Sequence, residues 1–269
     1  MAPILHCVRH AQGFHNLNNT NHSIRDPLLT PFGEGQCSAL ATNFPSHDKI
    51  ELVIASPMKR TLYTALLGFG QDIERIGKPI IAIPELQETS DLPCDTGSSP
   101  EDIAREFAGK PVDLGLVKPG WNSKQLLFAP TQEAIELRAK QARLWLMSRP
   151  EKEIVVVTHG TAPFSLSPLT LILYTNKHTG GFLHYFTEEW AGSSGASGTG
   201  WANTEYRSYT FSSADPAGAH LVETPESLRR RMGNDKPLDG SEQTQLKRTA
   251  MMDWMARGYI QNSGAAAKL

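Results

Sequence analysis

The sequence is poor in cysteine and has no long apolar run. Three cysteines occur among 269 residues, and their positions lack the spacing of metal ligands. An odd number of scattered cysteines is typical of a protein from a reducing compartment and argues against a disulfide scaffold. No apolar run approaches the roughly 18 residues of a membrane span, and charged residues interrupt the first apolar stretch, which makes it a poor signal peptide. We therefore expect a cytoplasmic protein with no membrane partner.

An excess of charge is also absent. The net charge is −2, from 26 basic and 28 acidic residues. The protein thus lacks a basic field that would attract nucleic acid, and an anionic substrate would need a local cluster of cations. The length and the 39% hydrophobic content suit one sizeable soluble domain.

Several phosphotransfer motifs are missing as well. No cysteine is followed six residues later by the arginine that a cysteine phosphatase needs. The sequence contains neither an Asp-x-Asp nucleophile motif nor a Gly-x-x-x-x-Gly-Lys phosphate loop. Chemistry based on a cysteine nucleophile, an aspartyl phosphate or a P-loop therefore lacks support.

Short apolar runs alternate with helical patterns along the chain. Runs rich in β-branched residues, as buried strands are, occupy residues 3–8, 50–55, 80–83 and 154–158. Thr30-Pro31, Ser56-Pro57 and Ser99-Pro100 are helix-start signals, and the second of them places Arg60 in the first turn of its helix. Residues 131–147 carry the longest helical period. This alternation predicts an α/β fold, a three-layer sandwich with a mostly parallel central sheet flanked by helices.

Polar residues follow three of the predicted strands. Arg9 and His10 come after the first, Ser56 after the second and His159 after the last. In parallel sheets, functional groups gather beyond the carboxyl ends of the strands. These side chains should therefore meet at one edge of the sheet.

Four sequence motifs surround these positions. They are VRHAQGFHN at 8–16, ASPMKRTLYTA at 55–65, PELQE at 84–88 and VVVTHG at 155–160. In this order they resemble the motifs of the histidine phosphatase (phosphoglycerate mutase-like) superfamily. Within it, the chain most resembles fungal members whose substrate is not assigned. The resemblance covers roughly residues 3–211, and Ala11 replaces the glycine that usually follows the histidine.

The resemblance implies a metal-independent phosphomonoesterase that acts through a phosphohistidine on a small phosphorylated metabolite, without a cofactor. It assigns His10 as nucleophile and Glu88 as proton donor and acceptor, with Glu85 as a rival for Glu88. It assigns phosphate binding to Arg9, Asn16, Arg60 and His159. These residue types suit the chemistry, since planar arginine forks match phosphate oxygens and a neutral imidazole can attack phosphorus.

The same resemblance leaves two alternatives open. A phosphoglycerate mutase-type phosphotransferase would return the phosphoryl group to a second hydroxyl, and a catalytically impaired relative would bind phosphate without turnover.

Three further histidines, His15, His22 and His184, are expected to have no part in catalysis. Residues 91–97 are expected to cap the pocket. No feature of the sequence specifies the substrate or an oligomeric state.

The predicted domain organisation is a catalytic domain at 1–215 and a polar extension with a tail at 216–269, including an amphipathic helix at 241–256.

Residues 161–180 separate the motif that ends at Gly160 from the segment that begins at Gly181, and they are predicted to be an insertion. Their number keeps the reading frame, so a translated intron is the favoured origin and a surface loop the alternative. The last three residues, Ala267-Lys268-Leu269, resemble a peroxisomal address and predict that part of the protein is peroxisomal.

Overall fold

The computed structural model describes residues 2–160, 181–190, 200–213 and 217–261. The predicted insertion at 161–180 and the peroxisomal tripeptide at 267–269 lie outside the described residues. None of the described helices is both long enough and apolar enough to cross a membrane. All three cysteines are buried, and none of them is part of a disulfide bond.

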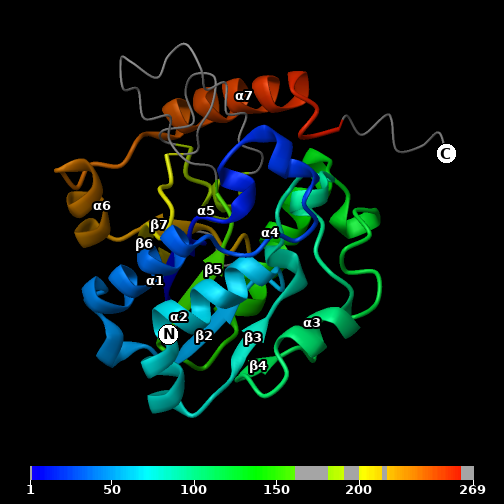
Figure 1. Ribbon diagram of the computed structural model, residues 1–269. Coiled ribbons are helices and arrows are strands. Elements are labelled where there is room, and N and C mark those ends of the chain that lie inside the picture. The colour runs from blue at the N-terminus through cyan, green and yellow to red at the C-terminus, as the bar shows by residue number, and fades with distance from the viewer. Residues whose placement is uncertain (1, 161–180, 191–199, 214–216, 262–269) are drawn as a thin grey trace, which may run out of the picture.

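A seven-stranded sheet forms the centre of the molecule, with the strand order β4-β3-β2-β5-β1-β6-β7 (Figure 1). The strands are β1 (Ile4–Arg9), β2 (Leu52–Ala55), β3 (Ile80–Ala82), β4 (Val112–Asp113), β5 (Glu153–Thr158), β6 (Tyr206–Phe211) and β7 (Leu221–Glu223). The five strands from β4 to β1 in this order run parallel, whereas β6 is antiparallel to both of its neighbours. The predicted mostly parallel sheet is therefore confirmed.

Two predicted helix starts have the expected caps, and the helix predicted at 131–147 is capped as well. The side-chain oxygens of Thr30, Ser99 and Thr131 accept hydrogen bonds from backbone N–H groups in the first turns of α1 (Pro31–Asn43), α3 (Pro100–Glu106) and α4 (Gln132–Met147). Such caps satisfy donors that have no partner within the helix. The local sequence therefore determines where these helices begin.

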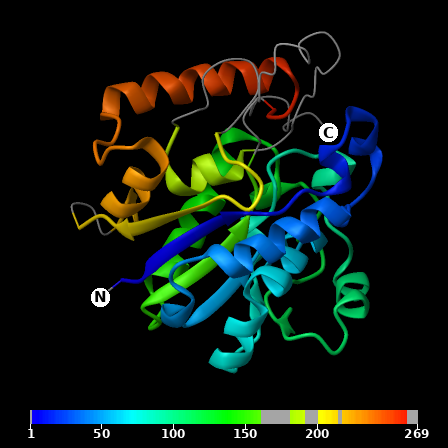
Figure 2. The ribbon, with the colours of Figure 1, turned by 60° about the vertical axis from the view of Figure 1, so that its left-hand side comes forward.

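Helices cover both faces of the sheet (Figures 1 and 2). On one face α1, α2 (Lys59–Ile76) and α3 pack on Val53 and Val155. On the other face α4, α5 (Phe182–Thr187) and α7 (Gly240–Ala256) pack on Ile54 and Val156. Side chains alternate between the faces of a strand, so each central strand contributes to both cores. These apolar layers hold the sheet edge in place.

The start of α2 differs from the sequence prediction. Ser56-Pro57 was expected to begin this helix, but the helix begins at Lys59, after Met58 as N-cap. Ser56 instead continues from the end of β2, where its N–H donates to the carbonyl of Val157 over 3.0 Å. Arg60 still lies in the first turn of α2, as expected.

The C-terminal segment joins the same sheet and core. Strand β7 pairs with β6, so the predicted domain boundary at residue 215 falls between two adjacent strands. Helix α6 (Pro225–Met232) follows β7, and from α7 Ala250 and Met251 pack into the core beside α4 and α5. The sequence analysis predicted neither the strands β6 and β7 nor the helix α6, because short elements rich in polar residues have little hydrophobic periodicity.

Candidate active site

The candidate site lies at the carboxyl ends of β1, β2 and β5, which are neighbours in the sheet. The N–H of His10 donates to the carbonyl of Thr158 over 3.0 Å, which ties the residue after β1 to β5. The imidazole rings of His10 and His159 lie 5.3 Å apart between centroids. The sheet therefore brings these two histidines together although they are distant in sequence.

His10 is held in one tautomer. Its Nδ1 lies 2.7 Å from the carbonyl oxygen of Ala11, and a carbonyl can only accept, so Nδ1 carries the proton. Nε2 is then the acceptor for Arg60 Nε, at 3.3 Å. Burial, followed by the positive charges of Arg60 and Arg9, lowers the pKa of His10 well below its usual range. His10 is therefore neutral at pH 7, with the lone pair of Nε2 directed toward a cation.

Two buried guanidinium groups flank His10. Arg60 donates from Nη1 to the carbonyl of Cys94 over 2.7 Å and forms an ion pair with Asp95 at 3.3 Å. Arg9 donates from Nη1 to the carbonyl of Trp201 over 2.7 Å, and its buried Nε has no partner among the described residues. A buried donor without a partner is costly, so this atom is available to an incoming acceptor.

His159 and Ser56 form a hydrogen-bonded pair. His159 Nε2 lies 2.9 Å from the Ser56 hydroxyl, whereas Nδ1 is buried with no partner among the described residues. Burial and the charge of Arg60 lower the pKa of His159 well below its usual range. The Ser56 hydroxyl can donate to Nε2 or accept from it; in the first arrangement the neutral ring carries its proton on Nδ1, which is then a donor without a partner among the described residues.

The expected bystander His15 is part of this cluster. Its ring lies 5.4 Å from that of His10 and the residue is 5% exposed. Asn16 reaches the cluster only through His15, because its Nδ2 lies 3.2 Å from His15 Nε2 and its Oδ1 accepts from the N–H of Gly13. The structure therefore brings His10, Arg9, Arg60 and His159 together, whereas Asn16 lies behind His15 and contacts that residue.

Glu88 is buried at the same edge and Glu85 is not part of it. Glu88 Oε1 accepts hydrogen bonds from the N–H groups of Thr89 at 2.8 Å and Gly181 at 3.2 Å. Burial, followed by the negative charge of Asp95, raises the pKa of Glu88 to about 7. Glu85 is half-buried and lines a separate cavity of about 250 Å³ beside α4. Glu88 therefore has the location and the pKa of an acid that exchanges protons near neutrality, and Glu85 lies outside the cluster.

Arg138 on α4 holds the loop that carries Glu88. Its guanidinium donates to the carbonyls of Glu85, Gln87 and Glu88 at 2.7, 2.6 and 3.1 Å, and it lies 4.4 Å from the ring centroid of Phe182. The sequence reading missed this arginine, since it appears there as an ordinary helix residue. Three carbonyl contacts to one guanidinium fix the backbone on which the Glu88 side chain depends.

Two further charged residues of the site were missed. Asp95 is 1% exposed and accepts from Arg60 and, at 2.6 Å, from the hydroxyl of Ser90. It belongs to the 91–97 loop that was expected to cap the pocket, so the sequence indicated its segment but not its role. Lys124 reaches the carbonyl of Glu88 over 2.8 Å, and no local motif signals this contact.

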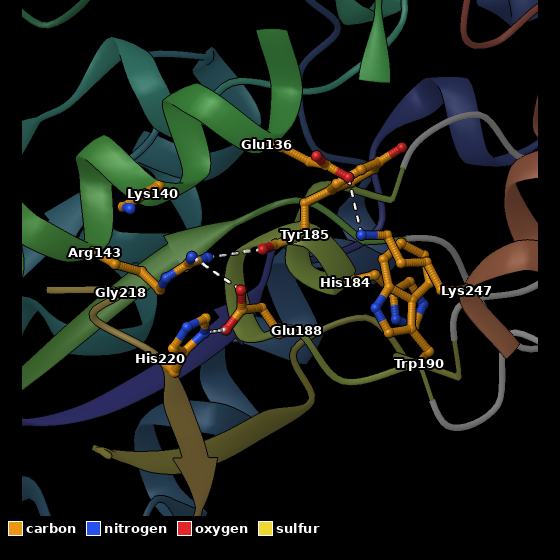
Figure 3. Close-up of a pocket in the computed structure, with 10 residues that line it drawn as sticks. All are labelled: Glu136, Lys140, Arg143, His184, Tyr185, Glu188, Trp190, Gly218, His220 and Lys247. Atoms are coloured by element: carbon orange, nitrogen blue, oxygen red, sulfur yellow. Dashed lines mark hydrogen bonds and ion pairs between the residues drawn. The ribbon is translucent and has the colours of Figure 1, made fainter. Parts of the chain in front are cut away.

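A larger cavity lies elsewhere, beside α4, α5 and α7 (Figure 3). Its volume is about 320 Å³, and its lining includes the pairs Arg143–Glu188 at 3.1 Å and Lys247–Glu136 at 2.9 Å. None of its lining residues belongs to the cluster around His10. Because most of its charged groups are paired with one another, this cavity is a weaker candidate for phosphate chemistry.

Two curated proteins are similar to this chain in sequence. The "Probable phosphatase" of Schizosaccharomyces pombe is 32% identical over 158 residues, covering 58% of this chain and 73% of that protein. Phosphoglycerate mutase-like protein 1 of Arabidopsis thaliana is 32% identical over 194 residues, covering 58% of this chain and 67% of that protein.

Solved structures similar to this chain include the native structure of the mycobacterial glucosyl-3-phosphoglycerate phosphatase. It shares 16% identity, with a TM-score of 0.46, over 83% of this chain and 97% of that one. The sequence profile of the histidine phosphatase superfamily (branch 1) matches residues 5–167, which include the segments that carry His10, Arg60, Glu88 and His159. The chain therefore belongs to the histidine phosphatase superfamily, branch 1.

Proposed function

We propose that this protein is a phosphomonoesterase that works through a phosphohistidine on His10. The observation that carries the proposal is the pair of contacts on the His10 ring, Nδ1 to the Ala11 carbonyl at 2.7 Å and Nε2 to Arg60 at 3.3 Å. A neutral imidazole with its lone pair directed at a guanidinium is prepared for a nucleophilic attack on an anion that the guanidinium binds. The phosphoryl group would occupy the place between Nε2 and the surrounding cations.

The cations and neutral donors around His10 would bind the phosphoryl oxygens. Arg9 and Arg60 supply two buried positive charges for a group that carries nearly two negative charges. His159 supplies Nδ1–H, while Asn16 is the most distant of the proposed donors. A loose phosphoryl-transfer transition state spreads charge over three oxygens, so donors positioned in advance lower the barrier.

Glu88 would move the protons. In the first step Nε2 attacks phosphorus, the ester P–O bond breaks, and the Glu88 carboxyl gives its proton to the leaving oxygen. In the second step water attacks phosphorus, Glu88 takes a proton from it, and the N–P bond breaks to release phosphate and neutral His10. A pKa of about 7 supports both roles at neutral pH.

The test is hydrolysis of p-nitrophenyl phosphate with and without a chelator. The purified protein should release nitrophenol equally in both cases, and brief mixing with substrate followed by denaturation should yield an acid-labile phosphoprotein. His10→Ala should show neither turnover nor labelling, whereas it should keep the thermal unfolding profile of a folded protein. Turnover that survives in His10→Ala would disprove the mechanism.

A further inference from the structure

The backbone that follows His10 leaves the sheet and must find partners elsewhere. Strand β1 ends at Arg9, whose carbonyl accepts a hydrogen bond from the N–H of Thr204 over 3.0 Å. The N–H of His10 donates to the carbonyl of Thr158, which continues the pairing with β5 by one residue. Buried N–H and C=O groups beyond this point still need partners, and a strand that has ended cannot supply them.

Two side chains hold the peptide group that joins His10 to Ala11. Asn203 Nδ2 donates to the His10 carbonyl over 2.8 Å, and the Ala11 N–H donates to Thr64 Oγ1 over 3.0 Å. The Thr64 hydroxyl itself donates to the carbonyl of Arg60 over 2.7 Å, so its oxygen is left to accept from Ala11. Thr64 is fully buried in α2, and Asn203 lies shortly before β6. Segments far apart in the chain therefore fix both ends of one peptide group.

A third side chain holds the next peptide group, which joins Ala11 to Gln12. The N–H of Gln12 donates to Gln36 Oε1 over 2.8 Å, and Gln36 belongs to α1. The carbonyl oxygen of the same group is the acceptor for His10 Nδ1 at 2.7 Å. A rotation of this group would therefore withdraw the acceptor from the His10 ring.

We propose that Thr64, Asn203 and Gln36 are positioning residues that fix the tautomer and the direction of the His10 ring. These three residues are called the peptide clamp below. The inference rests on the proposed function, in which His10 carries its proton on Nδ1 and presents Nε2 to phosphorus. A neutral imidazole that has lost the Ala11 acceptor can carry its proton on either nitrogen, and the form protonated on Nε2 has no lone pair there for the attack.

A matched set of variants tests the peptide clamp. Thr64→Val keeps the shape of the side chain but leaves the buried Ala11 N–H without its acceptor, whereas Thr64→Ser keeps the hydroxyl. Asn203→Leu and Gln36→Met remove the other two contacts with little change in size. Thr187→Val is the control, because Thr187 is also buried and also donates to the carbonyl four residues before it over 2.7 Å.

The tautomer of His10 is the direct readout. In protein labelled with ¹⁵N in its histidine rings, NMR without substrate distinguishes Nδ1–H from Nε2–H, and His10→Ala identifies the His10 signals by their loss. The unaltered protein and Thr64→Ser should show Nδ1–H alone. A second population protonated on Nε2 should appear in Thr64→Val, Asn203→Leu and Gln36→Met. Thr187→Val should show no such population.

Kinetics measure the consequence for the reaction. Misplacement of the nucleophile should lower kcat for p-nitrophenyl phosphate by roughly ten- to hundredfold in Thr64→Val and in Asn203→Leu. Inhibition by inorganic phosphate should change by less than about threefold, because Arg9 and Arg60 remain in place to bind it. In the double variant the loss of kcat should be smaller than the product of the two single losses, since both contacts hold one peptide group.

The outcomes separate positioning from general stability. A His10 ring that stays protonated on Nδ1 in the three clamp variants would overturn the inference. So would a loss of kcat in Thr187→Val as large as that in Thr64→Val, or single losses that simply multiply in the double variant. If the unaltered protein hydrolyses no phosphomonoester, the proposed function fails, whereas the tautomer measurement needs no substrate and still decides whether the clamp acts on His10.

Discussion

The backbone N–H of Leu183 donates to the carbonyl oxygen of His159 over 2.9 Å. Residues 161–180 lie between these two residues in the sequence. If they were absent, Leu183 would be the fourth residue after His159, which is the spacing of an α-helical hydrogen bond. The hydrogen bond thus joins the end of β5 directly to the start of α5.

The first prediction is that a protein in which Gly160 is joined directly to Gly181 folds and keeps the site. Removal of the intervening chain lowers the entropic cost of closing that loop, so the free energy of unfolding should rise by roughly 1–3 kcal/mol. Chemical denaturation of the two proteins measures this difference, and p-nitrophenyl phosphate hydrolysis reports on the site. Lower stability or activity in the deletion variant would show that residues 161–180 belong to the functional protein.

The origin of the segment can be determined separately. We propose a translated intron, so sequencing of mature transcripts should find molecules that lack the codons for residues 161–180. Transcripts that uniformly retain these codons would reject that origin, whatever the deletion variant does.

The second prediction concerns Arg60. Arg60→Lys should lower kcat/KM for phosphomonoesters by on the order of 10² to 10³, comparable to the loss of a positioned donor to developing charge. The lysine keeps the positive charge next to Asp95, but one ammonium cannot reach His10 Nε2, the Cys94 carbonyl and Asp95 as the guanidinium does. Steady-state kinetics measure the loss, and a circular dichroism spectrum controls for folding. A rate within about twofold of the original would contradict the role of Arg60.

The third prediction is that Glu88→Gln lowers the activity and raises the stability of the protein above neutral pH. The amide keeps an acceptor for Thr89 and Gly181 but cannot exchange a proton, so kcat should fall by roughly 10² to 10⁴. Because the pKa of Glu88 is about 7 in the folded protein against 4.5 for an ordinary glutamate, the original protein loses stability as the pH rises through this interval.

Thermal unfolding at several pH values checks the second half of this prediction. The variant should melt at a higher temperature than the original protein at pH 8, where the folded original holds a buried charge. The difference should be small at pH 4, where the carboxyl is largely protonated in both the folded and the unfolded states. If the melting temperatures of the variant and the original protein differ by the same amount at pH 4 and at pH 8, the raised pKa of Glu88 is contradicted.

The fourth prediction concerns Asp95→Asn. The negative charge of Asp95 raises the pKa of Glu88, so its removal should lower that pKa. Glu88 must be protonated for the first step, and the alkaline limb of kcat/KM against pH should therefore move to lower pH. Arg60 also loses its ion pair, so the maximum rate should fall. An alkaline limb that stays in place or moves to higher pH would argue against Glu88 as the proton donor.

Local patterns in the sequence determined the framework of the fold. The buried runs at 50–55 and 154–158 became β2 and β5, because continuous apolar β-branched residues favour central strands. The caps at Thr30 and Ser99 began α1 and α3 as expected. The motifs around His10 and His159 identified the family, since each is a contiguous stretch that can be recognised without knowledge of its neighbours.

Only the tertiary structure decided which other side chains join the site. Asp95, Lys124 and Arg138 meet Arg60 and Glu88 through contacts between segments that are far apart in the chain. No periodicity or short motif encodes such contacts, because they depend on how loops and α4 pack against the sheet edge. The sequence by itself therefore determined β1, β2, β3 and β5, the starts of α1 and α3, and the motif residues. The packing of distant segments decided the burial and the charged neighbours that set the pKa of Glu88.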